Sequence, residues 1–336
     1  MKRTSLLLIT SVVVIQLSLT GCSQRDGVLQ QLDREFQRLS GALSPAIVLL
    51  LPVGDDGETT GISGSALAIG INGELLTTAS AIKDGKPLVA QFSDGRRSPV
   101  TLIGSDWETN LALLRLDSAR ADLSIPLIGA HDVATGQLGI LVGSAPMISG
   151  AVVMYGMLSK TTLGGDDPYD APLYALSAPS MLARPGAPVF DVSGRLLGIV
   201  DGKMHAISSG SWTVVPLRTI KAVLPLLERG GGVPRGVLGV VPNPSGETAE
   251  GGVIVKEVVP ESPAEKAGIK SEDIIIECDQ MRTLRISSLR VTVAGKPGQT
   301  VGVSYLRGGK RVDVNIPLGS HVGTPNDPQR DPFRKL

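Results

Sequence analysis

Histidine is the side chain best suited to move protons near neutral pH, and this chain of 336 residues has only three. They are His131, His205 and His321. None has a matched nucleophile beside it, and the sequence has no HExxH, Cys-x-x-C or P-loop motif. We therefore expect ordinary surface or hydrogen-bonded histidines, and no metal or other cofactor.

The stretch MLARPGAPVFDVSGRLLGIV, residues 181–200, surrounds two short apolar runs with turn-forming residues. Prolines and glycines favour tight turns, and Ser193-Gly194 is typical of a hairpin turn. The stretch predicts a tight loop that leads into a β-hairpin.

Short apolar runs separated by turn signals extend from Ala46 to about Val215. Together with 41 glycines, 23 prolines and only 3% aromatic residues, they favour many short strands in an antiparallel barrel or sandwich. The 32 basic and 32 acidic residues give a net charge of zero, so we expect no nucleic-acid partner.

The N-terminus has the pattern of a targeting segment. Lys2 and Arg3 precede the apolar run LLLITSVVVIQLSL, and Thr20-Gly21-Cys22 follows it. This end resembles the lipobox of bacterial lipoproteins, which implies lipid attachment at Cys22. The implied location is the bacterial cell envelope, at the outer membrane facing the periplasm in a Gram-negative cell. The alternative is an ordinary secretory signal with a chance cysteine.

The second cysteine, Cys278, would then have no disulfide partner. It lies in the apolar run DIIIECDQ, which predicts a small buried hydrophobic residue.

Composition shifts divide the chain into six expected segments. They are a signal peptide (1–22), a helical stalk or packing element (23–45), a strand-rich domain (46–228), a linker (229–235), a second domain (236–319) and a disordered tail (320–336).

The second domain contains RGVLGV, VPESPAEKAGIK and PGQTVGVSYLRGGKRVDVNIPL. These stretches resemble a PDZ domain of the type attached to the HtrA/Deg serine proteases. The first domain then resembles the protease half of that family, through GSALAIGINGELLTTASAI, GSDWETNLALLRL and ARPGAPVFDVSGRLLGIV. The resemblance implies a mainly β fold: a chymotrypsin-like double β-barrel followed by a C-terminal PDZ domain of α+β type.

The same resemblance assigns Ser80, Asn110 and Pro185 to the family's catalytic histidine, aspartate and serine positions. Proline has neither a hydroxyl nor a backbone N–H, serine is no base at neutral pH, and asparagine is neutral. We therefore predict that no residue at these positions is catalytic and that the chain is not an enzyme but a pseudoprotease. The alternative is an active serine-type endopeptidase or hydrolase whose site is rebuilt or misplaced.

Within the PDZ-like domain, the loop Val237, Leu238, Gly239 and Val240 matches the family's carboxylate-binding loop. There, backbone N–H groups capture a C-terminal carboxylate and the peptide adds to the sheet edge. Ile286, Leu289 and Val293 are predicted to line an apolar pocket, although each could equally be a core residue.

The predicted partners follow from the resemblance. They are C-terminal or unfolded peptides, an active HtrA-type homologue, the membrane through the lipid anchor, and other copies in a homotrimer. The predicted role is that of a scaffold, regulator or chaperone-like factor in envelope protein quality control.

Overall fold

The computed structural model describes most of the chain beyond residue 32. The described residues are 33–70, 72–82, 85–117, 133–145, 148–161, 173–177, 184–204, 211–247, 251–283 and 295–322, with 27, 30, 31, 125, 286, 289, 292 and 293. The predicted signal peptide with Cys22 lies outside these residues, as do His131 and His205. Within them, no helix has both the length and the apolar character needed to span a bilayer.

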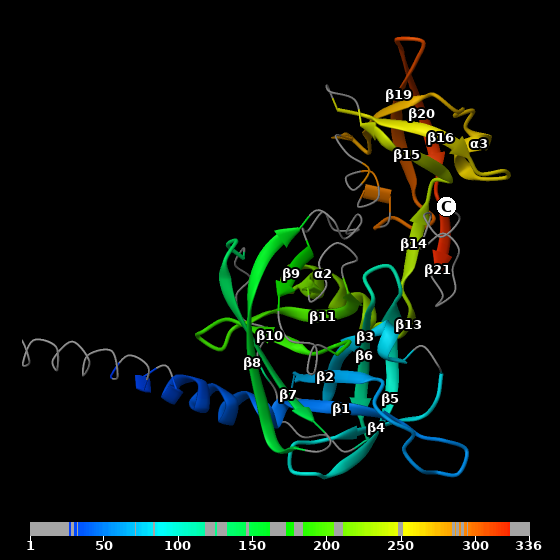
Figure 1. Cartoon of the computed structure of the whole chain (residues 1–336). Coiled ribbons are helices and arrows are strands. Elements are labelled where there is room, and N and C mark those ends of the chain that lie inside the picture. The colour runs from blue at the N-terminus through cyan, green and yellow to red at the C-terminus, as the bar shows by residue number, and fades with distance from the viewer. Residues whose placement is uncertain are drawn as a thin grey trace, which may run out of the picture.

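Six strands from the first part of the chain close an antiparallel barrel (Figure 1). They are β1 (Ile47–Pro52), β2 (Gly64–Ile69), β3 (Glu74–Thr78), β4 (Leu88–Gln91), β5 (Arg97–Asp106) and β6 (Leu111–Leu116). They follow the order β5-β4-β1-β2-β3-β6, and pairing of β5 with β6 completes the circle. Because β1, β2 and β6 are apolar along almost their whole length, they bury nearly every side chain.

Six more strands form a second closed barrel. They are β7 (Gln137–Ala145), β8 (Ile148–Thr161), β9 (Leu173–Ser177), β10 (Pro188–Phe190), β11 (Leu196–Met204) and β12 (Ser211–Pro216), in the order β10-β11-β12-β9-β8-β7. Leu141, Leu176 and Val189 lie in its core, while Ile140 and Phe190 join the core of the first barrel. The two barrels therefore share a packed boundary.

Helical elements precede and follow the barrel strands in the sequence. Residues 33–43 are helical and are followed by the 3₁₀ turn η1 (Ser44–Ala46), and Leu39 and Leu43 are buried in the first core. The segment therefore packs against the first barrel through these two side chains. At the other end, α2 (Leu217–Leu227) buries Ile220 and Val223 and ends two residues after Pro225.

The segment predicted as a linker is fixed to the first barrel. Its β13 (Gly231–Gly232) pairs with β5 in parallel, and β14 (Pro234–Val237) pairs with β21 (Gly319–Val322). The guanidinium of Arg235 forms an ion pair with Asp106 at the end of β5, and both side chains are almost fully buried. Thr109 donates a second hydrogen bond, of 2.6 Å, to the same carboxylate. Strand β21 also extends to Val322, inside the segment predicted as a tail.

The C-terminal domain is a sheet with a short helix at one end (Figure 1). Its strands are β15 (Val240–Glu247), β16 (Val253–Val258), β17 (Ile274–Cys278), β18 (Met281–Arg282), β19 (Thr300–Arg307) and β20 (Lys310–Pro317). The order is β15-β16-β17-β19-β20, with β18 paired to β17, and α3 (Pro263–Lys266) follows β16. Residues 286, 289, 292 and 293 are helical. The predicted architecture is confirmed: the protein is mainly β, with two six-stranded barrels followed by a C-terminal domain of α+β type.

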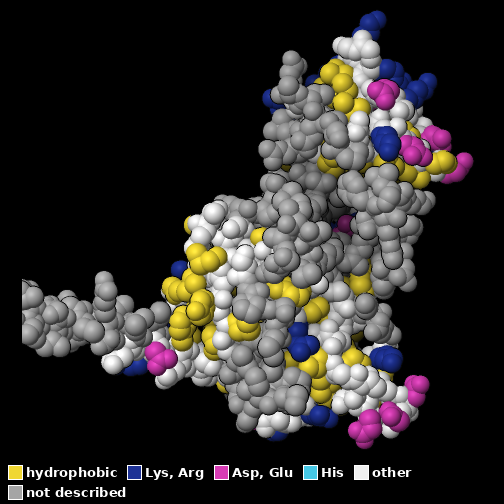
Figure 2. All heavy atoms as spheres, viewed as in Figure 1, with side chains coloured by type: hydrophobic (Ala, Val, Ile, Leu, Met, Phe, Trp, Pro, Cys, Tyr) yellow, Lys and Arg dark blue, Asp and Glu magenta, His cyan; other side chains and the backbone are white. Residues whose placement is uncertain are grey.

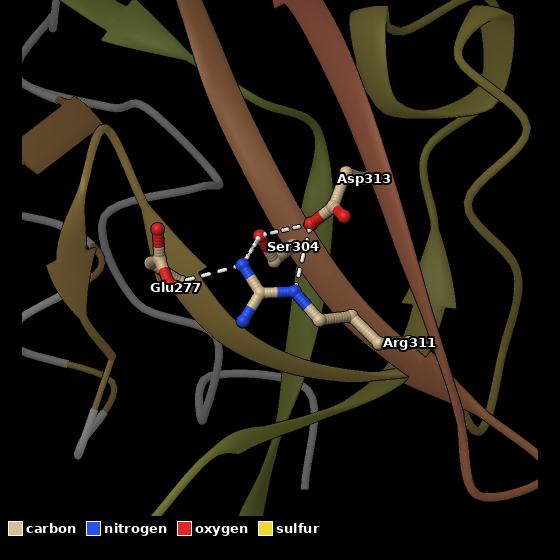
Figure 3. A network of polar contacts seen from close by, with 4 residues as sticks. All are labelled: Glu277, Ser304, Arg311 and Asp313. Atoms are coloured by element: carbon tan, nitrogen blue, oxygen red, sulfur yellow. Dashed lines mark hydrogen bonds and ion pairs between the residues drawn. The ribbon is translucent and has the colours of Figure 1, made fainter.

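The surroundings of Cys278 and Arg311 determine the role of each side chain in this domain. Cys278 is fully buried, and burial raises the pKa of its thiol to about 11, so it is an inert hydrophobic residue. Arg311 of β20 bonds to Asp313, Ser304 and Glu277 at 2.9, 2.8 and 3.2 Å (Figure 3). This network joins three neighbouring strands on an exposed face, where such contacts add little to stability.

Candidate functional site

The loop before the β10–β11 hairpin is a tight turn centred on Pro185 and Gly186. The N–H of Ala187 donates to the carbonyl of Arg184 at 3.0 Å, and Gly186 has φ +82°. Proline followed by a residue with positive φ is typical of a type II turn, so the sequence Arg-Pro-Gly-Ala specifies this conformation. A Cβ on Gly186 would lie 2.1 Å from the carbonyl oxygen of Ser65, so only glycine fits.

Ser80 and Asn110 meet through hydrogen bonds although thirty positions separate them. Asn110 stands before β6 with φ +56°, a conformation that asparagine tolerates. Its Oδ1 accepts from the N–H of Ser80 at 2.8 Å, and its Nδ2 donates to Oγ of Ser80 at 3.1 Å. The short 3₁₀ element η2 (Ala79–Ile82) therefore presents Ser80 to Asn110.

Asp201 of β11 completes this cluster, and the sequence analysis missed it. The amide Nδ2 of Asn110 donates to the carbonyl oxygen of Asp201 at 2.9 Å and to its carboxylate at 2.5 Å. Both side chains are buried. The contact spans the two barrels across 91 positions, so no local pattern pointed to it.

The structure brings all three sequence-predicted positions to one place between the barrels. The carbonyl of Pro185 accepts from the N–H of Ser65 at 2.8 Å, and a Cβ on Gly202 would lie 2.6 Å from Cγ of Pro185. A Cβ on Gly64 would touch both the carbonyl of Pro185 and Cβ of Ala81, the residue after Ser80. The boundary of the barrels therefore holds residues 80, 110, 185 and 201 together.

The chemistry of this cluster differs from that of a Ser-His-Asp triad. Residue 185 offers neither hydroxyl nor amide hydrogen, so it cannot be a nucleophile or an oxyanion donor. The hydroxyl of Ser80 is held by Thr78 at 3.1 Å and by Asn110, beside the carboxylate of Asp201. Among the described residues, no three His, Cys, Asp or Glu side chains are placed to hold a metal ion.

The second candidate site is the loop between β14 and β15. Leu238 is buried, and its carbonyl accepts from the N–H of Ala264 at 2.8 Å. Gly239 has φ +85°, and a Cβ there would lie 2.2 Å from Cβ of Ser262, which caps α3. A Cβ on Gly236 would lie 2.1 Å from the carbonyl of Val293. The loop and the strand before it therefore pack closely against Ser262 at the start of α3 and against the backbone of Val293.

The predicted pocket residues differ in how accessible they are. Leu289 and Val293 are buried in the core of the C-terminal domain, whereas Ile286 packs against that core and is only partly buried. Of the three, Ile286 is therefore the side chain best placed to meet a ligand. Val237 and Val240, which flank Leu238 and Gly239, are partly exposed.

Comparison with known proteins matches both halves of the chain. Residues 64–199 fit the model of a trypsin-like peptidase domain, and residues 236–318 fit the model of a PDZ domain. The chain belongs to the HtrA-type serine protease family. The family assignment made from the sequence is thus confirmed, whereas the degenerate and lipoprotein character that accompanied it is not shown.

Curated relatives align with most of the chain. The "Probable periplasmic serine endoprotease DegP-like" of Rhizobium meliloti is 30% identical over 279 residues, which are 79% of this chain and 55% of the relative. The protein of the same name from a Marinomonas species is 30% identical over 281 residues, again 79% of this chain and 58% of the relative. This HtrA-type chain thus spans little more than half the length of these relatives.

Solved structures agree with the fold. The HtrA-type protease AlgW, solved with a tripeptide, has a TM-score of 0.71 and 25% identity, covering 87% of this chain and 99% of that one. The serine endoprotease from Yersinia pestis has a TM-score of 0.70 and 25% identity, covering 85% and 98%.

These comparisons contradict the prediction that the chain is not an enzyme. The relatives are named serine endoproteases, and the structural neighbours are HtrA-type proteases. The prediction of a pseudoprotease rested on the side chains at positions 80, 110 and 185 alone, and these do not exclude a nucleophile at another position.

Asp191 holds the hairpin that follows the Pro185 turn. Its carboxylate accepts from the N–H groups of Ser193 and Arg195 at 2.8 and 2.9 Å, and from Nε of Arg195 at 2.7 Å. Burial by itself raises the pKa of Asp191, but the Arg195 amide, the Arg195 side chain and the Ser193 amide lower this pKa by more. The net pKa lies below its ordinary value of 3.8.

We predict that Asp191→Ala lowers the free energy of unfolding by about 1.5–3 kcal/mol at pH 7, because it removes bonds to a buried charge. A carboxylate with a lowered folded-state pKa stabilises the fold above pH 3.8 and loses this effect as the pH falls through the folded-state value. Urea denaturation at several pH values should therefore show a difference that shrinks toward pH 3.

The matched control is Asp94→Ala. Asp94 bonds to the N–H of Arg96 in a similar turn, but its side chain is 45% exposed, against 4% for Asp191. The control should cost clearly less. Equal losses in the two variants, or a loss at Asp191 that does not depend on pH, would contradict the account.

Proposed function

We propose that this HtrA-type chain binds polypeptides in the bacterial cell envelope and recognises their C-terminal carboxylates through its PDZ domain. The observation that carries the proposal is the loop 237–240, which is rigidly placed beside an open strand edge. Gly239 lets the backbone pass over Ser262, and the carbonyls of Leu238 and Gly239 are bonded within the domain. The N–H groups of such a loop are the natural ligands of a carboxylate.

Two further observations support the proposal. The neighbour AlgW is solved with a tripeptide, which supports peptide binding by this chain. The curated relatives are named periplasmic, which supports a place in the envelope. We further propose that Cys22 carries a lipid that holds the chain at a membrane, on the strength of the lipobox pattern.

Self-association into a homotrimer is part of this proposal. Tyr155 and Met157 of β8 are 63% and 48% exposed, and Phe36 stacks on Tyr155 with a centroid distance of 6.0 Å. Hydrophobic side chains gather on the flank where β8 lies (Figure 2). Exposed apolar patches of this kind mark protein–protein contacts.

The peptide proposal is tested by calorimetry with a decapeptide that ends in valine and its C-terminal amide. The free acid should bind the full chain at least about tenfold more tightly, because charge-assisted bonds to the loop need the carboxylate. Equal affinities, or no binding of the free acid, would contradict carboxylate capture.

Hydrolysis of the bound polypeptide is a second candidate function, and the names of the relatives favour it. We propose that residues 80, 110 and 185 occupy the three triad positions. A hydrolytic step would then require a nucleophile other than residue 185, since proline has no hydroxyl. Ser80, which is held beside Asn110 and Asp201, is the candidate that this cluster offers.

Under this second candidate, turnover of fluorescent casein by the purified chain should exceed the buffer rate. It should survive Pro185→Ala, which changes a residue without a reactive group, and should fall with Ser80→Ala. His205→Ala tests whether that histidine supplies the base. Turnover at the buffer rate would contradict this function, and loss on Pro185→Ala alone would contradict the assignment of the nucleophile.

A further inference from the structure

Among the described residues, strand β15 is an outer strand of the C-terminal sheet and pairs with β16 on one side. Its other edge is where a peptide would add as a further strand, directly after the loop 237–240. In an antiparallel pair, every second residue directs both its N–H and its C=O to the same neighbour. Which residues of β15 face the open edge therefore decides what a peptide can bond to.

Two sets of hydrogen bonds define this alternation. The carbonyl of Gly239 accepts from the N–H of Val259 at 2.9 Å, so Gly239 faces β16 and its neighbour Val240 faces the open edge. Further along, Pro242 is paired with Val255. Val255 donates to Asp273 and accepts from Glu272, both at 2.8 Å, so its backbone groups point away from β15. Pro242 therefore directs its own backbone to the open edge.

A proline at this position removes one group from the edge. Val240 offers both an N–H and a C=O, whereas Pro242 offers only a C=O because proline has no amide hydrogen. Pro244 stands two residues further along the same strand and lacks the hydrogen as well. Prolines occur on outer strands at outward-facing positions, which agrees with the geometry seen here.

An antiparallel peptide whose last residue pairs with Val240 places its third residue from the end opposite Pro242. The N–H of that third residue can still donate to the carbonyl of Pro242. Its carbonyl oxygen, however, meets no donor on β15. We propose that the PDZ domain of this chain recognises the C-terminal carboxylate and the last residue of a peptide, and that the residues before them add little binding affinity.

This proposal rests on the proposed peptide binding and states which residues of the peptide determine its affinity. The preferred ligand class is any polypeptide with an accessible, apolar C-terminal residue, with little selection for the sequence before it. A peptide-binding domain of this kind recognises many different chains by their ends.

The test compares a tripeptide with an octapeptide that has the same last three residues, by calorimetry on the full chain. In the unmodified protein the two should bind within about twofold of each other. In Pro242→Val both peptides should bind about 2- to 12-fold more tightly than before, which is the free energy of one backbone hydrogen bond, because both carry the carbonyl of the third-last residue. The same proline substitution at the far edge of the sheet, Pro317→Val in β20, should change neither affinity.

A second measurement uses only the unmodified protein, so it does not depend on the folding of a variant. Replacing the amide that follows the third-last residue of the octapeptide with an ester weakens the carbonyl of that residue as an acceptor. Affinity should not change, because β15 has no donor that faces this carbonyl.

The outcomes separate the two proposals. An octapeptide that binds more than tenfold more tightly than the tripeptide would overturn the proposal that the residues before the last one add little affinity. A severalfold loss of affinity with the ester would overturn it as well. Either result would leave peptide binding itself intact. Failure of both peptides to bind would instead contradict the proposed function itself.

Discussion

The supply of backbone N–H groups is the constraint on which both candidate sites depend. A chain that binds polypeptides does so largely through main-chain hydrogen bonds, and proline cannot donate one. This protein has a proline at the centre of the turn between the barrels, Pro185, and another on the open edge of its PDZ sheet, Pro242. Each fixes the local conformation and each removes a donor. Under the proposed function, a bound carboxylate therefore depends on the amides that remain, above all those of Leu238, Gly239 and Val240.

The rest of the fold keeps these few groups in place. Gly186 and Gly239 sit where any side chain would collide with Ser65 or Ser262. The buried ion pair between Arg235 and Asp106 joins the strand that leads into the PDZ loop to the end of β5, and Thr109 bonds to the same carboxylate next to Asn110. Because leaving either charge buried and unpaired is costly, this contact holds the connection in one arrangement.

Much of the fold follows from patterns along the chain. Alternating apolar runs and turn signals predicted the strands, the Pro-Gly pair at 185–186 predicted the turn, and VLGV followed by ESPAEKAGIK predicted the PDZ domain. The contacts between distant segments were not predictable in this way. Asp201 reaches Asn110 across 91 positions, and the outward direction of Pro242 follows only from the pairing of Val255. The prediction that the chain is not an enzyme was wrong because it rested on the side chains at three positions only.

A structure of the full chain bound to an octapeptide tests the central claim most directly. The account predicts that the terminal carboxylate lies within hydrogen-bond distance of the amides of residues 238–240, and that the carbonyl of the third-last residue has no protein donor. A peptide seated away from this loop, or one that pairs fully with β15 beyond Pro242, would contradict it.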